Sequence, residues 1–170
     1  MTTRRLFSVL RWALYALVFL LAMMVQTVVL SRGIHGFFVS CVPLAVACVS
    51  MQEGAEGGGA FALAAASLWC LSGADYGSAQ IVTLTVAGVL CGGLCQVVLT
   101  KKLLPAAGLC AMTLLLCDGT CFLLRLYLGA AGGAQAAAYL LPSLGISLCF
   151  FPLFYVPAHF IARIGRGPGA

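Results

Sequence analysis

Few residues of this chain have side chains that could carry chemistry, and the acid Asp118 is the most informative of them. It interrupts an otherwise uncharged run from Leu103 to Leu124, where a carboxyl group costs about 2.5–3.5 kcal/mol to insert into a membrane. Arg125 follows seven residues later, on the same helix face and about 10 Å along the axis. These two intramembrane polar residues indicate either an ion or substrate site or a polar latch between helices.

The groups that would make an enzyme do not accompany Asp118. Acid–base or nucleophilic catalysis needs a second titratable group, or a nucleophile with a base, and no such pair lies near it in the sequence. No hydrophilic stretch is long enough to form a separate catalytic domain. The sequence therefore predicts a protein that is not an enzyme, with no catalytic residue and no cofactor.

The nine cysteines and two histidines do not form a metal-binding pattern. The cysteines lie in apolar runs without a C-x-x-C spacing, and His35 and His159 are far apart in the chain. Cysteine behaves as a small apolar residue in such runs, so we expect the cysteines to pack between helices. The histidines are expected at the membrane interfaces, and no metal site is predicted.

Long apolar runs must position these residues. Ala79–Thr100 and Leu103–Leu124 contain 22 residues each, and only Lys101 and Lys102 separate them. As a helix, each run would reach about 33 Å, which is enough to cross a hydrocarbon core of about 30 Å. Since 63% of all residues are hydrophobic and only 8% are charged, the chain is predicted to be an all-α, polytopic integral membrane protein.

The same pattern divides the 170 residues into a single membrane domain with six transmembrane helices. Pro43 predicts a kink in the second helix, and three prolines predict a bent or broken sixth helix. The glycine-rich residues 52–59 are predicted to form a flexible cytoplasmic turn. The predicted spans are residues 12–30, 34–51, 57–74, 79–100, 103–124 and 137–161.

The positive charges predict an orientation for these spans, because short loops rich in Lys and Arg stay in the cytoplasm. With six spans, seven basic residues fall on the side of the N-terminus, and only Arg32 and Arg125 fall on the other side. Both termini are therefore predicted to be cytoplasmic, and the net charge of +5 reflects topology rather than nucleic-acid binding. The seven residues are Arg4, Arg5, Arg11, Lys101, Lys102, Arg163 and Arg166.

Gly88 and Gly92 form a G-x-x-x-G spacing in the fourth predicted span. In lipid, helices associate through small residues that let their backbones approach closely. This face is therefore predicted to be a helix-packing surface, which is more often used within one chain than between chains.

Several short segments between residues 25 and 96 occur in an order that is typical of one membrane-protein family. They are the apolar-Gln ending of the first span at Val25–Leu30, Pro43 in the second span, and the glycine-containing segments Gly59–Phe61, Asp75–Ala79 and Val86–Leu90. Together with six spans and a length of 170 residues, these segments resemble the family of the rod-shape-determining protein MreD.

The resemblance implies a non-enzymatic membrane subunit of the bacterial cell-elongation (rod shape) complex, located in the cytoplasmic (inner) membrane. Its partners would be membrane lipids, an MreC-like protein and other membrane proteins that organise peptidoglycan synthesis. The resemblance implies no catalytic residue, no cofactor and no nucleic acid.

A transport component is the alternative hypothesis. The substrate-binding membrane subunit of an energy-coupling-factor type vitamin transporter has a similar length and a similar number of spans. In that case Asp118, Arg125 and Trp69 would line a pocket near the outer face. A small-molecule ligand is expected only under this alternative.

Overall fold

The computed structural model describes the chain in five segments, and every element in them is a helix. The described residues are 2–29, 39–72, 77–97, 103–128 and 133–164. The predicted all-α fold class is confirmed for these residues. The elements are α1 (Thr2–Met24), its π-helical continuation η1 (Val25–Val29), α2 (Cys41–Leu71), α3 (Gly77–Val97), α4 (Leu103–Tyr127), α5 (Gly133–Cys149) and α6 (Phe151–Arg163).

Three of the described helices are long and apolar enough to cross a membrane, and a bent pair of helices makes a fourth if it counts as one span. Their outward faces carry large exposed apolar side chains, among them Leu20, Val82 and Leu115. Lipid tails cover such faces, so the chain is a membrane protein. The segments are Leu6–Val28, Ser78–Val97, Pro105–Tyr127 and the pair Leu141–Cys149 with Phe151–Arg163.

The helix α2 is not one rod, because the chain doubles back within it at Gly54. Gly54 has φ +84°, outside the helical region, whereas the other α2 residues remain helical. The Ser50 hydroxyl donates a hydrogen bond of 3.3 Å to the Gly58 carbonyl oxygen. Eight residues of unbroken helix would separate these two residues by about 12 Å. We call residues 41–53 the first limb of α2 and residues 55–71 its second limb.

The reversal at Gly54 corrects the prediction of a flexible turn over residues 52–59. Only Gly54 leaves the helical conformation, so Gly57, Gly58 and Gly59 belong to the second limb. A positive φ strains any residue with a Cβ, which explains why the turn falls on a glycine. The third predicted span, residues 57–74, includes these glycines, and so does the second limb. Ala74, where that span was predicted to end, lies outside the described residues.

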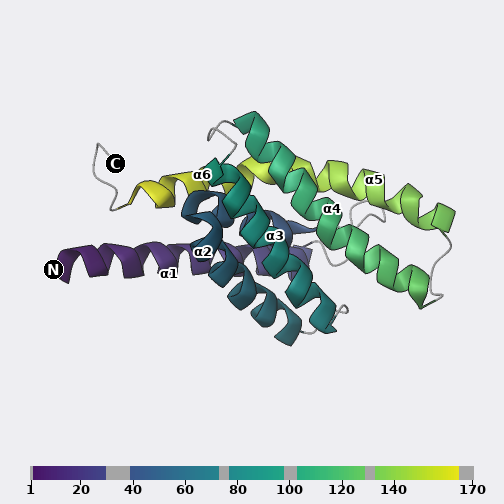
Figure 1. The fold of residues 1–170 in the computed structure, drawn as a ribbon, viewed down its shortest axis with the longest axis horizontal. Helices are drawn as coiled ribbons and strands as arrows, with labels where there is room; N and C mark the ends of the chain where they lie inside the picture. The colour runs from purple at the N-terminus through teal and green to yellow at the C-terminus, as the bar shows by residue number, and fades with distance from the viewer. Residues whose placement is uncertain (1, 30–38, 73–76, 98–102, 129–132, 165–170) are drawn as a thin grey trace.

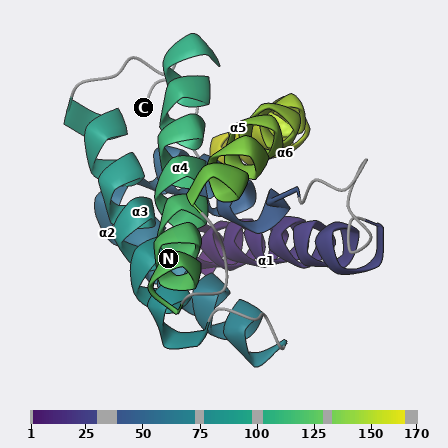
Figure 2. The same cartoon turned by 90° about the vertical axis from the view of Figure 1, so that its right-hand side faces the viewer.

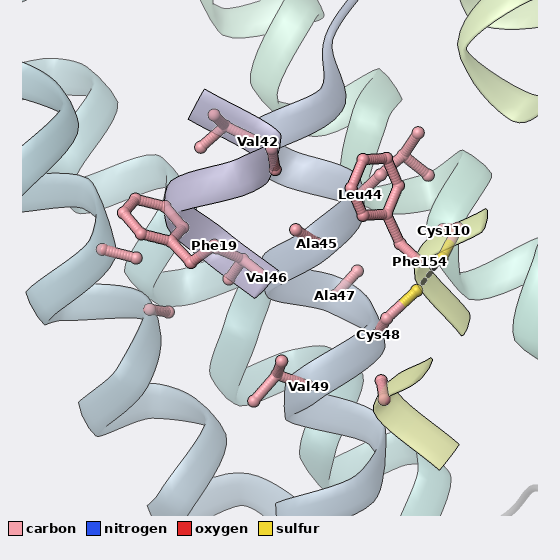
Figure 3. Close-up of a cluster of buried hydrophobic side chains, with 14 of the residues drawn as sticks. Phe19, Val42, Leu44, Ala45, Val46, Ala47, Cys48, Val49, Cys110 and Phe154 are labelled. Atoms are coloured by element: carbon pink, nitrogen blue, oxygen red, sulfur yellow. Dashed lines mark hydrogen bonds between the residues drawn. The ribbon is translucent and has the colours of Figure 1, made fainter. Parts of the chain in front are cut away.

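The first limb forms the core of the molecule. Every residue from Cys41 to Gln52 is buried. Phe19 of α1, Cys110 of α4 and Phe154 of α6 lie around it, as Figure 3 shows. A helix of this length reaches about 20 Å, less than the hydrocarbon core of about 30 Å, so the first limb alone is too short to cross a membrane.

Pro43 lies in the first turn of this buried limb, and the prediction that it kinks a helix is wrong. A proline in the first turn removes no intrahelical hydrogen bond, because the N–H groups there have no helical acceptor. The described part of the second predicted span begins only at residue 39. The first part of that prediction, residues 34–38, therefore lies outside the described residues.

The second limb and α3 lie in close backbone contact at Gly88 and Gly92. A Cβ atom on Gly88 would lie 2.5 Å from the Cβ of Ala62, and one on Gly92 would overlap the backbone of Gly54. This contact lies within one chain. The helix α2 contacts both α1 and α3, and Figure 2 shows α3 running beside α2.

The long helices do not all run in one direction. In Figure 1, α1 and the α5–α6 pair lie along the long axis, with the beginning of α1 and the end of α6 at the same end of the molecule, whereas α3 and α4 run obliquely to them. The helix α4 ends, and α5 begins, at the other end. The first limb of α2 lies between them and contacts α1, α4 and α6.

The helices α5 and α6 confirm the prediction of a bent or broken last span. They are bent by 44° at a break of one residue, Phe150. Pro152 lies at the start of α6, where its missing N–H is tolerated, while Pro142 and Pro157 lie inside helices. The remaining bounds also shift: α1 begins at Thr2 rather than at residue 12, and α4 continues to Tyr127.

The contact between α2 and α3 predicts how alanine at Gly92 would behave. Gly92→Ala should destabilise the protein by about 1–3 kcal/mol, because the new methyl group overlaps the Gly54 backbone. Gly108→Ala is the matched control, since a Cβ at that position would have no other atom within 4 Å. Thermal unfolding in detergent, followed by size-exclusion chromatography, measures both. Equal stability of the two variants would contradict the close contact.

Candidate functional site

Asp118 lies in α4 and faces the start of α2. The Ser40 hydroxyl donates a hydrogen bond of 3.0 Å to Asp118 Oδ1. The other carboxylate oxygen, Oδ2, is buried and has no hydrogen-bond partner among the described residues. Within this part of the chain, the acid therefore keeps an unused acceptor inside the protein.

The same neighbourhood satisfies the N–H groups at the start of the first limb. The Ser40 N–H donates to Ser147 Oγ of α5 at 3.1 Å, and the Val42 N–H donates to Gln26 Oε1 of η1 at 2.9 Å. Pro43 has no N–H to satisfy. Helix N-termini buried in apolar surroundings need such partners, since water does not reach them. A carboxylate near this end also interacts favourably with the helix dipole.

A second interhelical bond lies one turn further along α4. The Cys121 thiol donates to Gln80 Oε1 of α3 at 2.9 Å, and Gln80 is buried. Hydrogen bonds from this region thus reach η1, α3, α4, α5 and the start of α2. We call this set the Asp118 cluster: Gln26, Ser40, Gln80, Asp118, Cys121 and Ser147.

The three residues that the transport hypothesis combined differ in their surroundings. Asp118 bonds to Ser40 in the interior, whereas Arg125 is exposed in the last turn of α4. Trp69 is buried near the end of the second limb. The carboxylate's hydrogen bond thus goes to a serine that sequence reasoning did not single out.

A second polar group lies where the first limb ends. Arg11 Nη2 of α1 forms an ion pair of 3.0 Å with Glu53 Oε2, and the two side chains are only 20% and 6% exposed. The Tyr15 hydroxyl donates to Glu53 Oε1 at 2.8 Å. Trp12 and Phe61 pack around Tyr15. This group fixes α1 to the reversal at Gly54.

The sequence assigned Arg11 to topology alone and placed Glu53 in a flexible turn. The structure pairs the two residues. In the sequence, only their opposite charges at the ends of separate apolar runs indicate that the two residues could pair. Because they are more than 40 positions apart, this pairing could not be predicted. A charged residue beside an apolar run can mark either a membrane boundary or a buried partner.

The other residues assigned to topology lie at the ends of helices or outside the described residues. Arg163 is exposed in the last turn of α6. Arg4 and Arg5 lie in the first turns of α1, and their side chains are not described. The predictions for Lys101, Lys102, Arg166 and Arg32 fall outside the described residues.

Five of the nine cysteines are buried, as expected of packing residues, whereas Cys149 is exposed. All nine cysteines are free. Cys48 and Cys110 face one another across the core with their Sγ atoms 3.9 Å apart, as the dashed line in Figure 3 shows. His159 stacks on Tyr155 with ring centroids 6.0 Å apart. Within the described residues, no three His, Cys, Asp or Glu side chains form a group that could hold a metal ion. His35 lies outside them.

Comparisons of the chain with protein families, with curated proteins and with solved structures found no match.

The ion pair between α1 and α2 predicts that removing the charge of Glu53 lowers stability far more than removing the charge of an exposed acid. Glu53→Gln leaves the Arg11 guanidinium without its anion in a buried site, so we expect a loss of about 3–5 kcal/mol. Adding Arg11→Met should restore part of this loss, because no unpaired charge then remains. Glu56→Gln is the control, since Glu56 is exposed three residues away. The measurement compares the unfolding midpoints of Glu53→Gln, Arg11→Met, the double variant and Glu56→Gln with that of the wild type. Additive losses in the double variant would contradict a direct pair.

Proposed function

We propose that this chain is a non-enzymatic scaffold subunit of a membrane complex, and that its polar side chains hold its own helices in place for contact with partner proteins. One observation carries the proposal: the buried polar groups are used in bonds between helices. Arg11 and Glu53 join α1 to α2, while Ser40 and Ser147 join α2 to α5. An enzyme would instead direct such groups toward a substrate.

The proposal includes six membrane crossings with both termini in the cytoplasm. The reversal at Gly54 supports it, because it returns the chain so that Gly58 lies beside Ser50. The second limb would then supply the third crossing, while the first limb, which is too short alone, would form part of the second. The beginning of α1 and the end of α6 lie at the same end of the molecule. Arg11 and Arg163 belong to that end, which is consistent with basic residues on the cytoplasmic side.

The resemblance of residues 25–96 to the MreD family gives the scaffold its proposed setting. The complex would be the bacterial cell-elongation machinery of the inner membrane. The chain would contact an MreC-like protein and other membrane proteins that organise peptidoglycan synthesis. The wide lipid-facing surface of α1, with residues such as Leu17 and Leu21 exposed, is compatible with helix partners inside the membrane.

A second candidate function, the vitamin-binding membrane subunit of a transporter, is favoured by one observation. Asp118 Oδ2 is a buried acceptor without a hydrogen-bond partner, and an intramembrane acid of this kind often marks a ligand or ion site. The described hydrogen bond of the carboxylate goes to Ser40, so this alternative depends on Oδ2 rather than on Oδ1.

Depletion of the protein in its bacterium distinguishes the two functions. A scaffold of the elongation machinery should be needed for rod shape, so depleted cells become round, and the tagged protein should co-purify with an MreC-like partner. A vitamin subunit should instead create a nutrient requirement and retain a small molecule through purification. Depleted cells that keep their rod shape, and that need only an added vitamin to resume growth, would contradict the scaffold function.

Asp118→Asn sharpens this test. Asparagine keeps an oxygen that accepts the Ser40 hydrogen bond, so the fold should persist. Under the scaffold function this variant should restore rod shape to depleted cells. Ser67→Ala, which removes a hydroxyl that bonds to the Leu63 carbonyl of its own helix, serves as the control. Failure of a folded Asp118→Asn protein to restore shape would show that the carboxylate does more than hold helices.

A further inference from the structure

We propose that the Asp118 cluster is a binding site for a monovalent metal cation, with sodium as the ion it would take. The proposal concerns this cluster alone and is independent of the scaffold function. It begins with the charge of Asp118, whose Oδ2 atom is buried without a hydrogen-bond partner. A carboxylate in an apolar interior is strongly unfavourable unless it is paired, protonated or bound to a metal ion.

The described hydrogen bond to Asp118 does not neutralise its charge. The Ser40 hydroxyl is neutral and reaches only Oδ1. The start of α2 contributes a partial positive charge, which favours a carboxylate nearby but is smaller than one elementary charge. A monovalent cation at Oδ2 would neutralise the carboxylate directly.

The available ligand atoms are oxygens, which hard cations prefer. Ser147 Oγ accepts one hydrogen bond from the Ser40 N–H, and Gln80 Oε1 accepts one from the Cys121 thiol. Each of these oxygens keeps a second lone pair. With the carboxylate, they are the candidate ligand oxygens, and they come from α3, α4 and α5.

The charge of this set favours a monovalent ion over a divalent one. The cluster contains a single carboxylate, and within the described residues no three acidic, histidine or cysteine side chains come together as a metal-binding group. A divalent ion would leave a net positive charge in an apolar interior. The direct bonds of 2.9–3.1 Å that join members of the cluster favour an ion over a bulkier organic cation.

The start of a short buried helix is also where membrane proteins build ion sites. Interrupted helices near the middle of the membrane provide polar ends that bind substrates and coupling ions. Here the first limb of α2 begins inside the bundle, beside Asp118, and bonds from the cluster hold it to η1 and α5. A cation at Oδ2 would therefore stabilise the junction of five elements.

The experiment uses the purified full-length chain in detergent. Thermal unfolding is measured in sodium, potassium and choline chloride at one ionic strength. We expect sodium to raise the unfolding midpoint by about 5 °C or more relative to choline once it exceeds its Kd about a hundredfold. Binding of radiolabelled sodium should saturate at one ion per chain.

Three variants connect the effect to the cluster. Asp118→Asn should abolish both sodium binding and the shift, and Ser147→Ala should weaken binding about tenfold or more, whereas Ser67→Ala should leave both unchanged. If Asp118→Asn does not fold, radiolabelled sodium on the wild type and on Ser147→Ala still decides. Equal midpoints in sodium and choline, a sodium shift that survives in Asp118→Asn, or stabilisation by acid without sodium binding would each overturn the proposal.

Discussion

The reversal of the chain at Gly54 is the constraint on which the rest of the structure depends. A φ of +84° strains any residue that has a Cβ, so a glycine suits this position. Gly92 of α3 lies against the turn, and a Cβ on it would overlap the backbone of Gly54. The turn buries the first limb of α2 at the centre and places the second limb against α3. In lipid, where apolar surfaces gain little from meeting one another, such close backbone contact is what holds helices together.

A short helix at the centre of an apolar bundle creates two ends that must be satisfied without water. The Asp118 cluster and the ion pair of Arg11 with Glu53 lie near those ends. Gln26 and Ser147 accept the N–H groups at the start of the first limb, beside Asp118, while Arg11 and Tyr15 hold Glu53 where the limb finishes. The positions of the polar residues thus follow from the position of the buried limb.

The sequence predicts the helical class and most of the apolar segments, because length and hydropathy decide these locally. It also indicates the break near Pro152 and the close-packing glycines Gly88 and Gly92. The partners of Asp118 and Glu53 could not be predicted, since they depend on which helices meet. Pro43 misled for a related reason: proline kinks a helix interior but suits a first turn, and the helix start at residue 41 leaves no clear mark in an apolar run.

The chain reverses at Gly54, and the proposed topology requires that the second limb of α2 lead back through the membrane. Single cysteines at the exposed positions Glu56, Ser72, Leu128 and Arg163, placed in a cysteine-free background, test it with a membrane-impermeant thiol reagent. The account predicts that positions 56 and 163 react from one face of the membrane and positions 72 and 128 from the other. Reaction of positions 56 and 72 from the same face would contradict it.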